Sequence, residues 1–85
     1  MTNRDEIERL VIKSTAIICK KPPDSLSMET LFGADLKFKS MQAVKLTALL
    51  EDAFDIRMPM ARVLKNQTLR DAVDLIVELL AEAVK

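Results

Sequence analysis

The sequence contains no histidine, and this absence excludes several kinds of chemistry. Without histidine, no Ser–His or Cys–His nucleophile pair can form, and the usual general base that titrates near neutral pH is missing. A structural zinc site also lacks ligands, because the chain has only one cysteine, Cys19. Cys19 cannot form an intrachain disulfide, and we expect a reduced, cytoplasmic setting. The composition therefore predicts a protein that is not itself an enzyme.

Large aromatic residues and net charge are also lacking. The chain has neither tryptophan nor tyrosine, and three phenylalanines are too few for a platform on which bases stack. Thirteen acidic and thirteen basic side chains cancel, so we expect no nucleic acid to bind a basic surface. No signal peptide is recognisable, and no apolar run is long enough to span a membrane.

The residues that are present favour a small helical domain. The 85 residues are 49% hydrophobic, which is enough for one domain, residues 1–85, held together by close helix packing. A single glycine and the scarcity of alternating β-branched residues argue against a sheet. We expect an all-α, up-down bundle of three main helices plus one short helix, with a long first loop.

The first helix is expected at about residues 3–19, where apolar side chains recur at helical spacing. Asn3 and Glu6 can form a capping box at its start. Thr2 and Asp5 are the alternative pair. The side chains expected on its apolar face are Ile7, Leu10, Val11, Ser14, Ile17 and Ile18.

The connection that follows, residues 22–39, is too apolar to be plain linker, so we expect an ordered loop folded over the core. A second helix is expected at about residues 40–54. The apolar residues of the loop are Leu26, Leu31, Phe32, Leu36 and Phe38. The apolar surface of the second helix consists of Val44, Leu46, Leu49, Leu50, Ala53 and Phe54.

Two further helices complete the expected fold. Pro59 fits the first position of a short helix that ends at Leu64. Thr68 and Asp71 predict a capping box at the start of the last helix. Its inward side chains are expected to be Leu69, Ala72, Val73, Ile76, Val77 and Leu80.

Ser40 is the most informative residue, because it follows the long loop and opens a strongly amphipathic helix. A hydroxyl there is expected to be exposed and to lie in the positive field of unpaired backbone N–H groups. A phosphate esterified to it would be held by the same field. The alternative interpretation is an ordinary helix N-cap, which stabilises the helix by about 1 kcal/mol.

The order of several residues resembles that of the acyl carrier protein family, the phosphopantetheine-dependent carrier domains, over most of the chain. The family typically shows a phenylalanine, then Asp-Leu-Gly-x-Asp-Ser-Leu, a helix that ends Leu-Glu-x-x-Phe, an Ile-Pro, and a Thr-Val that starts the final helix. The matching residues, without insertion, are Phe32, Asp35-Leu36, Ser40-Met41, Leu46, Leu50-Glu51, Phe54, Met58-Pro59 and Thr68-Leu69.

The resemblance implies that Ser40 carries a covalent 4′-phosphopantetheine arm derived from coenzyme A. A separate phosphopantetheinyl transferase, which uses magnesium, would attach the arm, and its terminal thiol would hold an acyl group as a thioester. The implied partners are that transferase and the acyl-transferring or condensing enzymes of fatty acid, polyketide or related lipid biosynthesis. A monomer is expected, since a carrier must dock and leave.

The chain departs from the family pattern around Ser40. Lys39 stands where the family has an aspartate, Lys37 replaces a glycine, and Gln42 and Lys45 replace acidic residues. Residues 37–45 thus carry three lysines and no acid, whereas residues 46–56 carry three acids and no base. Lys39 is interpreted as a changed contact with the transferase or with a specialised partner. The alternatives are a loss of modification and a plain solvated lysine.

The resemblance also predicts a surface for partner enzymes. Methionine adapts to varied apolar contacts, although it is also common in protein cores. An exposed acidic pair can bind a partner's arginines or simply be solvated. The residues assigned to partner binding are Lys39, Met41, Lys45, Glu51, Asp52 and Met60, and Ala48 and Met58 are expected on or beside the same surface. The candidates to line a space for an acyl chain are Val44, Leu49, Leu50, Phe54, Leu64 and Leu69.

Two other functions remain open at this stage. A peptidyl or D-alanyl carrier protein would share the fold and the modified serine. An unmodified helical interaction module would instead use the lysine patch of residues 37–45 and the surface of Met41 and Met60 to bind a partner protein.

Overall fold

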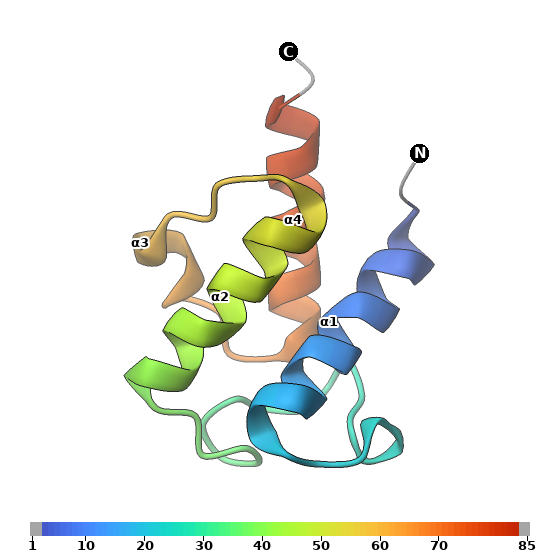
Figure 1. Ribbon diagram of the computed structural model, residues 1–85, viewed down its shortest axis with the longest axis vertical. Coiled ribbons are helices and arrows are strands. Elements are labelled where there is room, and N and C mark those ends of the chain that lie inside the picture. Colours follow the sequence, from blue (N-terminus) through green and yellow to red (C-terminus); the bar gives the residue numbers. More distant parts are fainter. Residues whose placement is uncertain (1–2, 84–85) are drawn as a thin grey trace.

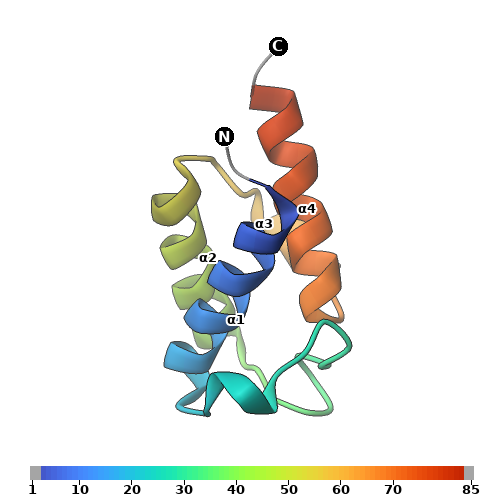
Figure 2. The same ribbon diagram turned by 90° about the vertical axis from the view of Figure 1, so that its right-hand side faces the viewer.

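The computed structural model describes residues 3–83, and this part of the chain forms an all-α fold, as predicted. Figure 1 shows α1 running in one direction and α2 and α4 running in the other. Helix α1 packs against both α2 and α4, and the short helix α3 packs against α4 (Figure 2). The helices are α1 (Arg4–Cys19), the single 3₁₀ turn η1 (Pro23–Ser25), α2 (Ser40–Phe54), α3 (Met60–Val63) and α4 (Leu69–Ala83).

Helix α1 begins and ends close to where the sequence predicts. The Asn3 side-chain oxygen accepts a hydrogen bond of 2.9 Å from the Glu6 backbone N–H, so this pair starts the helix. The alternative pair includes Thr2, which lies outside the described residues. At the other end Lys20 adopts a left-handed conformation, and its N–H donates to the carbonyl oxygen of Ala16. That geometry closes the last turn in the way a C-cap does.

Most of the side chains predicted to face inward from α1 and α4 are buried or pack against the core, but one in each helix is exposed. Ile17 is 61% exposed and Val77 is 38% exposed, so their predicted inward positions are wrong. In α1 the buried row passes through Ile7, Val11 and Thr15, four residues apart, and Ile17 lies two residues beyond it, near the opposite side. A polar residue in this row conceals the true face in the sequence. In α4 the buried residues include Leu75 and Leu79, which were not expected.

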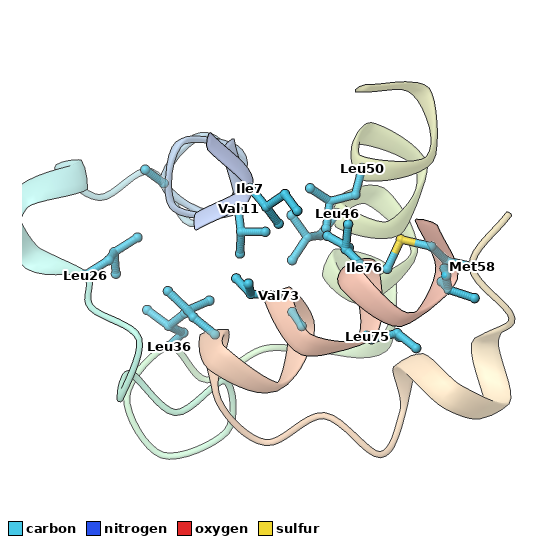
Figure 3. Packing of buried hydrophobic residues seen from close by; sticks show 14 residues of the cluster. Ile7, Val11, Leu26, Leu36, Leu46, Leu50, Met58, Val73, Leu75 and Ile76 are labelled. Atoms are coloured by element: carbon cyan, nitrogen blue, oxygen red, sulfur yellow. The ribbon is translucent and has the colours of Figure 1, made fainter. Parts of the chain in front are cut away.

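The core lies between α1, α2 and α4 and is closed at one end by the loop before α2 (Figure 3). Leu26 and Leu36 of this loop are buried, as expected for an ordered segment, whereas Leu31 is exposed. Backbone bonds fix the loop to the start of α4: Phe32 N–H donates to Gln67 at 2.9 Å, and Leu69 N–H donates to Thr30 at 3.1 Å. The loop is therefore positioned by the helix that follows it much later in the sequence.

The last two helices begin with well-formed ends. Pro59 is the N-cap of α3 rather than its first helical residue, because its carbonyl oxygen accepts from the N–H groups of Arg62 and Val63. The predicted capping box of α4 is present. Thr68 Oγ1 accepts from Asp71 N–H, and Asp71 Oδ2 accepts from Thr68 N–H, both at 3.1 Å.

Candidate functional site

Ser40 is the first residue of α2, and its side chain is exposed. The residue with N-cap geometry is Lys39, and the Ser40 hydroxyl makes no capping hydrogen bond. The interpretation of Ser40 as an ordinary N-cap is therefore wrong. The helix start is instead capped by a side chain that reaches back from inside the helix. Gln42 Oε1 accepts a hydrogen bond of 2.9 Å from the Lys39 backbone N–H. The Ser40 hydroxyl thus remains available to an incoming group.

The surroundings of this hydroxyl are positively charged. The first turn of α2 contains no acidic residue, and the unpaired N–H groups of a helix start attract anions. Lys37, Lys39 and Lys45 are exposed, and none of them forms an ion pair with another residue in 3–83. A phosphate bound to Ser40 would therefore meet attraction from both the helix and the lysines.

A cavity of about 240 Å³ opens beside Ser40. Its walls come from the loop before α2, from one side of α2 and from α3, and its floor is the core. Phe32 and Phe38 stand together in the loop wall, with ring centroids 4.9 Å apart. The lining residues are Phe32, Gly33, Phe38, Lys39, Ser40, Ala43, Leu46, Thr47, Leu50, Met58, Val63, Leu64, Asn66 and Ala72.

Only part of this lining was expected. Leu50 and Leu64 line the cavity as predicted. The other four candidates do not line it. Val44 and Leu49 face solvent and Leu69 is fully buried in α4. Phe54 lies at the far end of α2. The two loop phenylalanines carried a sequence signal, since they flank the expected site closely, whereas no local pattern identifies Asn66, which reaches the cavity through tertiary packing.

The residues predicted to bind partners are spread over α2 and α3. Lys39, Met41 and Lys45 are exposed in the residues around the Ser40 end of α2, and Met60 is exposed at the start of α3. Asp52 is exposed twelve residues after Ser40, roughly 18 Å along the helix. Of the two residues expected beside them, Ala48 is exposed, whereas the expectation for Met58 is wrong because it is buried in the core.

Glu51 has a visible role within the chain. Its Oε2 atom accepts a hydrogen bond of 2.7 Å from the backbone N–H of Met58. This bond fixes the segment that leads from α2 to α3, and so it helps to position one wall of the cavity. Partner binding by Glu51 stays a prediction.

Other chemistry is sparse in the part of the chain that the structure describes. Burial raises the pKa of the Cys19 thiol, which disfavours its reactive thiolate. No cluster of three or more possible metal ligands occurs within residues 3–83. Over the same residues, no helix has both the length and the apolar character needed to cross a bilayer.

Residues 9–76 match the family model described as "Phosphopantetheine attachment site". The matched segment contains Ser40, all of α2 and α3, and every residue that lines the cavity. The site fits the group that this family carries, because an exposed hydroxyl lies in a positive field for the phosphate and beside an apolar cavity. Since the match covers most of the chain, the protein belongs to the phosphopantetheine attachment site family, the carrier domains to which 4′-phosphopantetheine is covalently attached.

Proposed function

We propose that this protein is an acyl carrier protein and that Ser40 is the residue to which 4′-phosphopantetheine is attached. The observation that carries the proposal is the position of the Ser40 hydroxyl, exposed at the start of α2 and at the mouth of an apolar cavity. A phosphopantetheinyl transferase and biosynthetic enzymes are the partners that a carrier domain implies.

The other serines are poorer candidates. The chain has four serines, of which only Ser40 opens a long helix. Ser14 is half-buried within α1. Ser25 Oγ donates to the Pro22 carbonyl oxygen at 2.7 Å, and Ser27 Oγ accepts from the Glu29 N–H at 3.2 Å. Both of those hydroxyls are engaged in local turns.

The residues around Ser40 can be assigned separate tasks. The N–H groups at the start of α2, with Lys39 next to them, stabilise the negative charge of a phosphodiester. The attached group supplies a thiol, which holds an acyl group as a reactive thioester. Phe32, Phe38 and Leu64 provide an apolar surface on which the hydrocarbon chain of an acyl group can pack away from water. The protein's contribution is to hold, shelter and present the substrate, and we propose no catalytic step for it.

The cavity favours an acyl group over an aminoacyl group. Its floor and most of its walls are apolar, with Thr47, Asn66 and Ser40 itself as the neutral polar residues. Burying an ammonium group there would cost several kcal/mol without a charged partner, whereas burying methylene groups is favourable by about 0.8 kcal/mol each. We therefore place the protein in fatty acid, polyketide or related lipid biosynthesis rather than among peptidyl or D-alanyl carriers. We also propose that residues 1–85 act as one monomeric domain.

Loading of the purified protein tests the attachment site. The protein is incubated with coenzyme A, magnesium and a broad-specificity phosphopantetheinyl transferase, and its intact mass is measured. We expect an increase of one phosphopantetheinyl group in the wild type and in Ser25→Ala, and no increase in Ser40→Ala. Loading of Ser40→Ala would refute the assignment. Absence of loading in the wild type would instead support an unmodified interaction module.

A further inference from the structure

A row of residues on α2 leads from Ser40 into the cavity. Ser40, Ala43 and Thr47 are three and four residues apart, so they lie on one side of α2, and all three line the cavity. Thr47 lies seven residues beyond Ser40, roughly 10 Å along the helix axis. Leu46 and Leu50, which also line the cavity, are buried in the core. The row therefore runs from the exposed mouth of the cavity to its inner end.

Thr47 places an unpaired hydroxyl at this inner end. The residue is only 6% exposed, and its hydroxyl makes no hydrogen bond with any group in residues 3–83. Among the same residues, the one side-chain oxygen that is both fully buried and unpaired belongs to Thr15. The Thr47 oxygen therefore keeps some accessible surface, and that surface opens into the cavity that the residue lines.

Asn66 brings a second neutral polar group to the cavity from the segment after α3. It is half-buried, and its side-chain amide also lacks a hydrogen bond within the described part of the chain. Its backbone is fixed, because Asn66 N–H donates to the Val63 carbonyl oxygen at 3.0 Å and the next carbonyl, that of Gln67, accepts from Phe32 N–H at 2.9 Å. A residue held in this way loses little freedom when a ligand binds.

A plain hydrocarbon chain does not satisfy these two groups. A threonine hydroxyl and an asparagine amide can each donate and accept hydrogen bonds. Water satisfies such groups in an open cavity, and a chain without polar atoms would displace it and leave them unpaired. A hydroxyl or keto oxygen on the chain would replace the lost bonds. An ionised carboxylate fits less well, because the one charged residue in the described lining, Lys39, is exposed beside Ser40 at the mouth.

We propose that Thr47 and Asn66 make this carrier selective for an acyl chain that bears a neutral oxygen substituent, a hydroxyl or a keto group, over a plain hydrocarbon chain. The inference rests on the carrier function proposed above and narrows its substrate class. The new hydrogen bonds form only while the chain lies in the cavity. They therefore favour the sheltered state of an oxygenated chain over that of a plain chain of the same length.

The test compares chains of one length on the full-length protein. A phosphopantetheinyl transferase loads Ser40 from coenzyme A analogues in which an amide replaces the thioester, so that the chain cannot be lost. The probes are octanoyl and octanoyl chains that carry a hydroxyl or keto group near the carbonyl, in the middle or near the end. Urea unfolding measures how much each chain stabilises the fold, which gives the equilibrium constant for its insertion into the cavity. We expect this constant to be about tenfold larger for the best oxygenated chain than for octanoyl.

Apolar variants of the two residues provide the decisive comparison. Thr47→Val with Asn66→Leu should abolish the preference and should insert octanoyl better than the wild type does, and each single variant should lose part of the preference. Gln67→Leu is the matched control, because Gln67 is exposed, adjacent to Asn66 and outside the lining, and it should preserve the preference. In the wild type, the NMR signals of the Asn66 side-chain amide should shift more with the preferred chain than with octanoyl. Circular dichroism confirms that each variant is folded.

Three results would overturn the proposal. The first is equal insertion of all the chains in the wild type, which would also be seen if Thr47 and Asn66 bonded to the arm, since the arm is the same in every probe. The second is an unchanged preference in the double variant, and the third is an equal loss of preference in Gln67→Leu. Failure to load Ser40 would overturn the carrier function and this inference with it, whereas loading without any preference would overturn this inference alone.

Discussion

Replacing Thr15 by valine should stabilise the protein. Thr15 is fully buried in α1, and its hydroxyl has no hydrogen-bond partner in the described structure. In the unfolded chain that hydroxyl is hydrated, so folding loses about 1–3 kcal/mol of favourable interaction with water. Valine has nearly the same shape and a similar helix propensity. We therefore expect Thr15→Val to raise the free energy of unfolding by about 1–2 kcal/mol.

Thr30 provides a control with the opposite sign. It is also buried, but its Oγ1 atom accepts a hydrogen bond of 2.8 Å from the Ser27 N–H. Thr30→Val should leave this N–H without its partner and lower the free energy of unfolding by about 1 kcal/mol. Urea unfolding followed by circular dichroism measures both changes. The comparison requires that the free energy of unfolding falls with urea concentration at the same slope in each variant. Destabilisation by Thr15→Val would refute the account, because it would mean that the hydroxyl forms a stabilising bond.

Further predictions concern the site and the start of α4. Lys39→Asp should raise the rate of loading by a transferase with a basic docking surface, because repulsion becomes attraction; an unchanged or slower rate in a mass-based time course counts against this. Ala43→Phe fills part of the cavity and should speed hydrolysis of an acyl thioester on the loaded protein, whereas the exposed Ala48→Phe should not; equal hydrolysis rates would exclude sheltering there. Backbone N–H donors from Gln67 and Thr68 hold the pKa of Asp71 below its ordinary value. Asp71 therefore stabilises the fold above the unfolded pKa of about 3.9, and this contribution is lost as the pH falls through the lower folded pKa. In urea titrations at several pH values, Asp71→Ala should lose less stability below about pH 4 than the wild type does. Equal losses in the two proteins would contradict this role of Asp71.

Local signals in the sequence predicted most of the helix boundaries. The Asn3–Glu6 and Thr68–Asp71 pairs identify helix starts because their hydrogen bonds join residues three apart. The amphipathic stretch after Ser40 identified α2 for a similar reason. The position of Ser40 at the start of that helix followed directly from it.

Features that depend on how helices rotate against each other could not be predicted in the same way. Ile17 was expected inside because it is apolar, but packing against two helices selects the row that contains Thr15. The cavity is a further example, since its lining comes from the loop before α2, from α2, from α3 and from the start of α4. Val44 was expected there from hydrophobicity alone, whereas the structure places it on the outer side of α2.

The most direct test of the carrier function is the mass of the protein isolated from its own host. Intact-mass measurement followed by peptide mapping should find a phosphopantetheinyl group, bare or acylated, on the peptide that contains Ser40. The acyl group released from that peptide would identify the pathway. A protein that is unmodified at Ser40 under every growth condition tested would contradict the account.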